Sequence, residues 1–129
     1  MIKLYTDAAV NQHSGHAAIG ILIVKDGRQT QLKSKISSMN NHQAEFFAAI
    51  QGFLALKKMG TAANELIFYY TDSKIVVDSL TKSYAKHFEP QVTQLLALQQ
   101  AYDTVVNQWI PDSQNHGAHF LALQALHAK

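Results

Sequence analysis

Residues 66–72 have the sequence Leu-Ile-Phe-Tyr-Tyr-Thr-Asp. They end in the same three residues, Tyr-Thr-Asp, as residues 1–7, Met-Ile-Lys-Leu-Tyr-Thr-Asp. Both stretches are short and rich in apolar and aromatic residues, which predicts two β-strands that end in the same Tyr-Thr-Asp sequence. A carboxylate at the end of a buried strand is costly to desolvate, so it usually has a partner or a metal. One such motif alone is more typical of a turn, where aspartate is common. The repeated motif predicts an electronegative site at one edge of a sheet, formed by Asp7 and Asp72.

The composition is that of a small globular domain. The chain has 129 residues, of which 47% are hydrophobic, and this length suffices for one domain with its own core. No segment has the apolar length of a membrane span, and no basic stretch precedes an apolar one at the start, so we expect neither a membrane segment nor a secretory signal. The absence of cysteine excludes disulfides and thiolate metal sites and favours a cytoplasmic location. The formal net charge of +2 is weak evidence for a polyanionic partner.

Strand, turn and helix signals predict the element order βββαβααβα. A polar loop at 11–16 and the dipeptide Asp-Gly at 26–27, a strong hairpin signal, separate the first three strands. Gly60 is a natural helix terminator, Ser73 a natural cap, and Pro90 a natural first residue of a helix. We expect strands over 1–7, 17–25, 28–37, 65–71 and 105–110, and helices that begin near 41, 73, 90 and 114. This order predicts a single α/β domain over residues 1–129, with a hairpin meander followed by crossover connections.

Glu45 is the third acid of interest. We expect it in the first turn of a helix that begins near Asn41, where the helix dipole favours a carboxylate, and that preference alone would explain it. One turn further on, Ala48, Ala49 and Gly52 are all small, so this helix could press closely on the sheet and present Glu45 to the ends of the two strands. Three carboxylates cannot all stay ionised close together without a cation. Their oxygens favour Mg²⁺ or Mn²⁺, and two such ions would support phosphodiester hydrolysis.

Four motifs follow one another along the chain: Tyr5-Thr6-Asp7-Ala8-Ala9, Asn41-His42-Gln43-Ala44-Glu45-Phe46, Tyr70-Thr71-Asp72-Ser73, and Trp109-Ile110-Pro111 through Asn115-His116-Gly117-Ala118-His119-Phe120-Leu121-Ala122. In this order they resemble the type 1 ribonuclease H family over nearly the whole chain. The short loop 111–114 resembles the archaeal and plant-like branch of that family. The resemblance implies a ribonuclease H-like fold: a five-stranded mixed sheet, with strands 1–3 antiparallel and strands 4–5 parallel beside strand 1, flanked by helices.

The same resemblance implies a function. It implies an endonuclease that cuts the RNA strand of RNA–DNA hybrids with two Mg²⁺ or Mn²⁺ ions, held by the catalytic acids Asp7, Glu45 and Asp72. The hybrid would be read by its shape, its phosphates and the RNA 2′-hydroxyls. The protein would be a monomer with no small-molecule cofactor. The implied nucleic-acid contacts are Ala8, His13, Asn40, Asn41, His42, Ser73, Lys74 and Asn115.

His119 stands where the family has its fourth acid. In one interpretation the site is degenerate, and the protein is a module that binds hybrid or double-stranded RNA without cutting it. In the other, the imidazole takes the fourth catalytic and metal-binding position and shifts the metal preference toward Mn²⁺. The intact contexts of the three acids favour the second interpretation. A 3′–5′ exonuclease or an integrase core on the same sheet is a further possibility, because a fold does not fix a function, but the final motif argues against it.

Three further residues matter here: two depart from the family, and one is expected in the core. The family's loop glycine after the first aspartate is Ala8 here, and the second asparagine of its Asn-Asn pair falls at His42. Trp109, in the last expected strand, is expected in the hydrophobic core rather than on a surface that stacks against bases.

Overall fold

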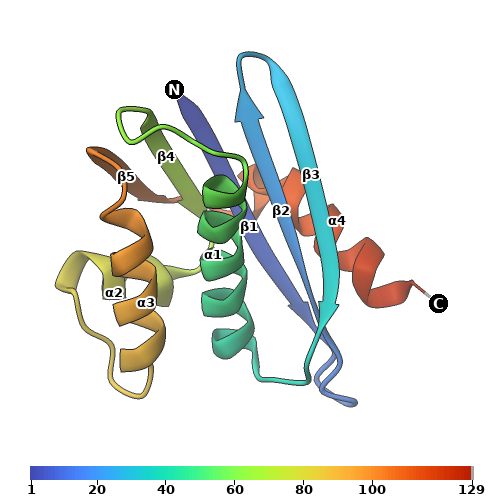
Figure 1. The fold of residues 1–129 in the computed structure, drawn as a ribbon. Helices are drawn as coiled ribbons and strands as arrows, with labels where there is room; N and C mark the ends of the chain where they lie inside the picture. The colour runs from blue at the N-terminus through green and yellow to red at the C-terminus, as the bar shows by residue number, and fades with distance from the viewer. Residues whose placement is uncertain (129) are drawn as a thin grey trace.

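The computed structural model describes residues 1–128 and contains one five-stranded sheet flanked by helices (Figure 1). Its elements are β1 (Ile2–Val10), β2 (Ala17–Lys25), β3 (Arg28–Ile36), α1 (Asn41–Lys58), β4 (Leu66–Thr71), α2 (Lys74–Lys82), α3 (Glu89–Gln99), β5 (Thr104–Trp109), the short 3₁₀ helix η1 (Asp112–Gln114) and α4 (His116–His127). The predicted order βββαβααβα is confirmed, with η1 inserted before the last helix.

The sheet has the strand order β3-β2-β1-β4-β5, with β1 at its centre. Strands β1, β2 and β3 pair antiparallel, whereas β4 pairs parallel with both β1 and β5. This arrangement confirms the mixed sheet that the sequence predicted. Helix α1 packs against β1 and β2 on one face of the sheet, with α3 beside it, and α4 crosses the opposite face over β1, β2 and β3 (Figure 1).

Local sequence signals explain where the elements turn and begin. Asp26 and Gly27 have φ angles of 51° and 75°, the left-handed backbone that a two-residue hairpin needs, and they join Lys25 to Arg28 across the β2–β3 pair. Helix α1 begins with a capping box in which the Asn40 side chain accepts a hydrogen bond from the Gln43 amide (2.8 Å), while the Gln43 side chain accepts one from the Asn40 amide (3.1 Å).

Several predicted boundaries were wrong. Strand β1 does not end at Asp7 but continues to Val10, because β2 pairs with it along its whole length. Glu45 lies in the second turn of α1 rather than the first, since the helix begins at Asn41 and its first turn holds no acid. The last helix begins at His116, after η1, rather than near 114.

Two glycines let helices approach the sheet closely. A Cβ atom on Gly20 of β2 would lie 2.1 Å from the Ala118 carbonyl oxygen and 2.6 Å from the Ala122 amide nitrogen, both in the backbone of α4. A Cβ atom on Gly52 of α1 would lie 2.8 Å from Thr6 Cγ2 of β1. These contacts set the depth at which α1 and α4 lie on the central strands, and therefore the positions of the side chains that they carry.

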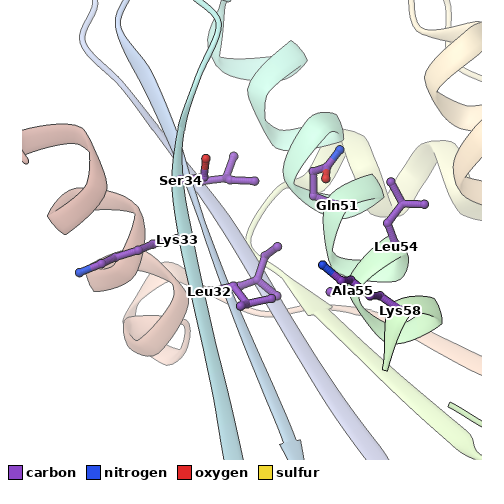
Figure 2. Close-up of a pocket in the computed structure, with 9 residues that line it drawn as sticks. Leu32, Lys33, Ser34, Gln51, Leu54, Ala55 and Lys58 are labelled. Carbon is purple, nitrogen blue, oxygen red and sulfur yellow. The ribbon is translucent and has the colours of Figure 1, made fainter. Parts of the chain in front are cut away.

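Helix α1 leaves the β3 edge of the sheet uncovered. A groove of about 260 Å³ runs between that edge and the helix, and it is lined by Ile19, Ile21, Leu32, Lys33, Ser34, Gln51, Leu54, Ala55 and Lys58 (Figure 2). The Lys33 side chain points across to α4, where its Nζ donates a hydrogen bond to Gln124 Oε1 at 3.1 Å. None of the helices within residues 1–128 combines the length and the apolar character that crossing a membrane requires.

Replacing Gly20 by alanine is expected to destabilise the protein by about 3 kcal/mol, because the backbone of α4 cannot move away from the new methyl group without leaving the sheet. Gly117→Ala is the matched control. Its methyl group meets only the end of the Leu22 side chain, and the gain in helix propensity offsets that displacement. Urea denaturation of both variants measures the difference, and equal losses in the free energy of unfolding would contradict this account of the α4 contact.

Candidate active site

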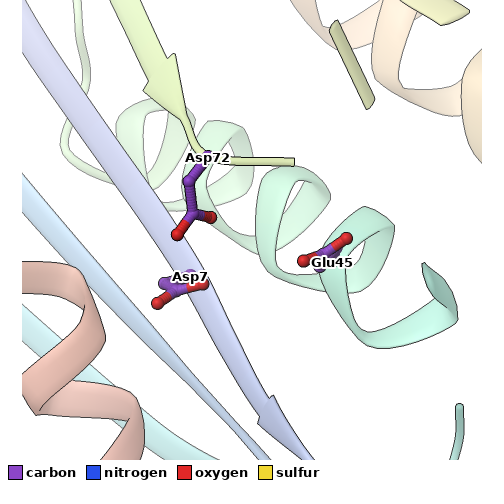
Figure 3. A group of neighbouring side chains, drawn as sticks. All are labelled: Asp7, Glu45 and Asp72. Atoms are coloured by element: carbon purple, nitrogen blue, oxygen red, sulfur yellow. The ribbon is translucent and has the colours of Figure 1, made fainter. Parts of the chain in front are cut away.

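Three carboxylates converge at one end of the sheet. Asp7 lies in β1, Asp72 directly follows β4, and Glu45 lies in α1, and each offers an oxygen within 4.8 Å of the others (Figure 3). The parallel register of β1 and β4 places Thr6 opposite Thr71, so the next residue on each strand is an aspartate. The three acids therefore converge in the structure as predicted. Asp7 lies within β1, however, and not at the end of that strand.

Burial makes the ionised form of these acids unfavourable. Desolvation, reinforced by the charge of Asp72, raises the pKa of Asp7 to about 7. Desolvation likewise raises the pKa of Glu45 and that of Asp72 above their usual values. Ionised carboxylates repel one another at such short range, so the binding of a cation at this site would be strongly favoured.

His119 of α4 contacts this cluster through Asp7. Its Nδ1 is 2.9 Å from Asp7 Oδ2, with a hydrogen bond between them, while Asp7 Oδ1 accepts a hydrogen bond from the Ala8 amide at 2.9 Å. Both oxygens of Asp7 thus have partners within the protein. His119 does not belong to the group of ligand atoms that lie within 4.8 Å of one another, so its role as a fourth ligand stays a prediction.

The donor set fits a hard divalent cation. Within residues 1–128, the only ion-pair partners of the three acids are histidines, namely His119 beside Asp7 at 2.9 Å and His42 beside Glu45 at 3.8 Å. No lysine or arginine among these residues neutralises the cluster. Clustered carboxylate oxygens without a basic partner are typical ligands of Mg²⁺ or Mn²⁺.

Most of the predicted nucleic-acid contacts are accessible near the start of α1 and α2. A pocket of about 570 Å³ lies between the β1–β2 loop and the start of α1, and Asn40 and Asn41 line it. Ala8 is half-buried beside Asp7. The exposed members of the predicted set are His13, Asn40, Asn41, His42 and Lys74.

Two members of the predicted set are buried. Asn115 is only 1% exposed, and its Nδ2 donates a hydrogen bond to the Thr6 carbonyl at 3.0 Å. Ser73 is 3% exposed, and its hydroxyl accepts a hydrogen bond from the Val76 amide at the start of α2. Their predicted contact with nucleic acid stays a prediction, and in the structure their side chains join elements of the site from inside.

Trp109 also differs from its prediction. It is 42% exposed rather than part of the core, its Nε1 donates a hydrogen bond to the Asp72 carbonyl at 3.0 Å, and Lys74 Nζ lies 5.6 Å from the centre of its ring. The end position of β5 explains this exposure, since the strand is at the edge of the sheet. No local feature of the sequence indicates that this indole supports the backbone of Asp72.

Comparison with known proteins gives one family and several relatives. Residues 5–125 match the reverse transcriptase-like family. EbsB of Enterococcus faecalis, a candidate hydrolase, is 36% identical over 98% of this chain and 94% of its own length. The ribonuclease H of Trichodesmium erythraeum is 31% identical over 67% of this chain, and ribonuclease HI of a Synechocystis strain is 28% identical over 68% of it. The matched region covers 52% of the length of each of these two ribonucleases.

Solved structures show the same fold. Ribonuclease H1 from the archaeon Halobacterium salinarum superposes with a TM-score of 0.87 at 26% identity, over 97% of this chain and 96% of its own. LC11 ribonuclease H1, solved in complex with an RNA/DNA hybrid, has a TM-score of 0.87 at 21% identity, over 98% of this chain and 96% of its own. The predicted resemblance to ribonuclease H and the predicted fold are confirmed, while placement in the archaeal and plant-like branch stays a prediction.

Replacing Asp7 by asparagine is expected to stabilise the metal-free protein by roughly 1–3 kcal/mol at pH 8. The pKa of Asp7 is raised from 3.8 to about 7 by burial, so its ionisation penalises the folded state increasingly between those pH values and fully above them. The stabilisation should therefore shrink toward pH 5. Urea denaturation with a chelator, at pH 5 and pH 8, measures this. Asp78→Asn, at an exposed acid of α2, is the control, and a gain that does not change with pH would refute the explanation.

Proposed function

The chain belongs to the reverse transcriptase-like family, and among its relatives are ribonucleases H; we propose that it is a divalent-metal-dependent endonuclease that hydrolyses the RNA strand of RNA–DNA hybrids. The observation that carries this proposal is the convergence of Asp7, Glu45 and Asp72 within 4.8 Å. We further propose that residues 1–129 act as one domain, as a monomer in the cytoplasm.

The three acids are proposed to be the catalytic metal ligands, with His119 as a fourth group. When bound, two Mg²⁺ or Mn²⁺ ions would activate a water molecule and stabilise the leaving oxygen of the phosphodiester. Asp7, Glu45 and Asp72 present their oxygens on rigid elements, so little reorganisation is needed to receive the ions. His119 orients Asp7 through Nδ1, which leaves Nε2 as the ring nitrogen with which it would ligate a metal.

Residues around the acids support recognition of the hybrid. Asn40, Asn41 and His42 are exposed at the start of α1, one turn before Glu45, and are proposed to contact the nucleic acid near its minor groove. Lys74 follows Asp72 and is exposed, so its ammonium group is available to a phosphate of the RNA strand. His13, exposed in the β1–β2 loop, and the Ala8 backbone are proposed as further contacts.

One observation favours a second function, a module that binds hybrid or double-stranded RNA without cutting it. His119 Nδ1 is hydrogen-bonded to Asp7 Oδ2, and an imidazole brings no negative charge to hold a second divalent ion. If this contact persists in the presence of metal, the chain would retain the fold and the nucleic-acid surface without the chemistry.

Cleavage of a labelled RNA–DNA hybrid separates the two functions. Wild-type protein is expected to cut the RNA strand with Mn²⁺ or Mg²⁺, and Asp7→Asn and Asp72→Asn are expected to lose the activity by about a hundredfold or more, because each removes a charged metal ligand. Asp78→Asn is the control, since it makes the same change at an exposed acid of α2. Hybrid binding without cleavage under both metals would favour the module.

His119→Asp tests the metal preference. Wild-type protein is expected to work better with Mn²⁺ than with Mg²⁺, because imidazole is a better ligand for transition metals, and the variant should lower the ratio of the two rates about tenfold. The ratio of initial rates at saturating metal is the measurement, with His116→Asp on the exposed side of α4 as the control. Equal Mn²⁺ and Mg²⁺ rates in both wild type and His119→Asp would rule out this role.

A further inference from the structure

A row of buried hydroxyl groups lies beneath the acid cluster. Thr6 of β1 and Thr71 of β4 face each other in the parallel register and are 1% and 3% exposed. Tyr69, two residues earlier on β4, is fully buried, and its hydroxyl lies 2.6 Å from Thr6 Oγ1 in a hydrogen bond. Each threonine immediately precedes an acid, Asp7 or Asp72. The side-chain contact between the two strands joins Thr6, one residue before Asp7, to Tyr69, three residues before Asp72.

Buried polar groups continue from these hydroxyls toward the third acid. Thr71 Oγ1 accepts a hydrogen bond from the Ser73 amide at 3.1 Å. The Ser73 side chain lies near Glu45, where it works against the rise that burial causes in the pKa of that carboxyl. Polar groups therefore extend from β1 and β4, through Ser73, to Glu45 in α1.

The packing of the Tyr69 ring does not require its hydroxyl group. The ring makes an edge-to-face contact with Phe53 of α1, with 5.3 Å between ring centres, which a phenylalanine would make equally well. A buried hydroxyl is unfavourable unless it is hydrogen-bonded. Burial also raises the pKa of Tyr69, and the nearby charges of Glu45 and Asp72 raise it further, so the phenol stays protonated beside the acids. It is a permanent neutral link rather than a proton carrier.

We propose that Tyr69 is a positioning residue of the metal site: through its hydrogen bond to Thr6, its hydroxyl fixes the separation of β1 and β4 next to Asp7 and Asp72. This inference rests on the proposed metal-binding role of the acids. The carboxylates repel one another when no cation is present, and the link between the strands below them resists that repulsion. The site is thereby held in the geometry that receives a divalent ion, at little cost in reorganisation.

Calorimetric titration of Mn²⁺ into the protein without nucleic acid tests the proposal. Tyr69→Phe is expected to bind Mn²⁺ about threefold to tenfold more weakly than wild type, the effect of losing one buried hydrogen bond. On hybrid substrate the same variant should lower kcat and leave KM unchanged. Phe53→Leu is the matched control, because it loosens the packing around the Tyr69 ring and keeps the hydroxyl. It should lower the melting temperature without changing Mn²⁺ affinity.

Substitutions at Thr6 test the same hydrogen bond through its other partner, the Thr6 hydroxyl. Thr6→Val removes it and should weaken Mn²⁺ binding, whereas Thr6→Ser keeps it and should restore the wild-type affinity. The double variant with Tyr69→Phe should bind hardly more weakly than either single variant, because both remove the same hydrogen bond. Wild-type affinity in Tyr69→Phe, or an equal loss in Phe53→Leu, would overturn the positioning role.

The outcomes separate this role from the proposed cleavage. If wild-type protein binds Mn²⁺ but leaves the hybrid intact, the endonuclease proposal fails, and a weaker affinity in Tyr69→Phe still supports the positioning role. If wild-type protein cuts the hybrid and Tyr69→Phe matches it in Mn²⁺ affinity and kcat, only the positioning role fails. Absence of Mn²⁺ binding by the wild-type protein would overturn both.

Discussion

The mutual repulsion of three carboxylates, one buried and two partly buried, is the constraint on which the rest of this structure depends. Asp7, Glu45 and Asp72 lie within 4.8 Å of one another, and burial raises the pKa of each. A folded chain tolerates such a group only if the surrounding elements hold it rigidly, or if a cation neutralises it. Both features are typical of a site that binds a divalent cation, since a carboxylate cluster that is unfavourable by itself is strongly stabilised by such an ion.

Close packing between helices and sheet is what holds the cluster. Gly20 lets the backbone of α4 rest directly on β2, and Gly52 lets α1 approach Thr6 on β1. With a larger residue at either position the helices would stand further from the sheet, and His119 or Glu45 would move away from Asp7. Stability and the geometry of the site are therefore coupled at these glycines, and Gly20 is also the residue of β2 that pairs with Asp7.

Much of the fold and of the site was predictable from residues that act locally. The Asp26–Gly27 turn, the cap at Ser73 and the repeated apolar runs give the element order correctly. The three acids were identified because desolvating a carboxylate restricts the places where one occurs. Prediction failed where long-range contacts decide. Pairing with β2 extends β1 beyond Asp7, and the position of β5 at the sheet edge exposes Trp109.

The sequence by itself determined the identity of the elements and the residue types available for chemistry, because propensity, turn geometry and the cost of burying charge act over a few neighbouring residues. Only the tertiary structure decided which polar groups meet. Tyr69 and Thr6 are 63 positions apart in the chain, and His119 and Asp7 are 112 apart. Such contacts depend on strand register and on the depth of helix packing, which a hydrophobic pattern does not encode at the precision of a hydrogen bond.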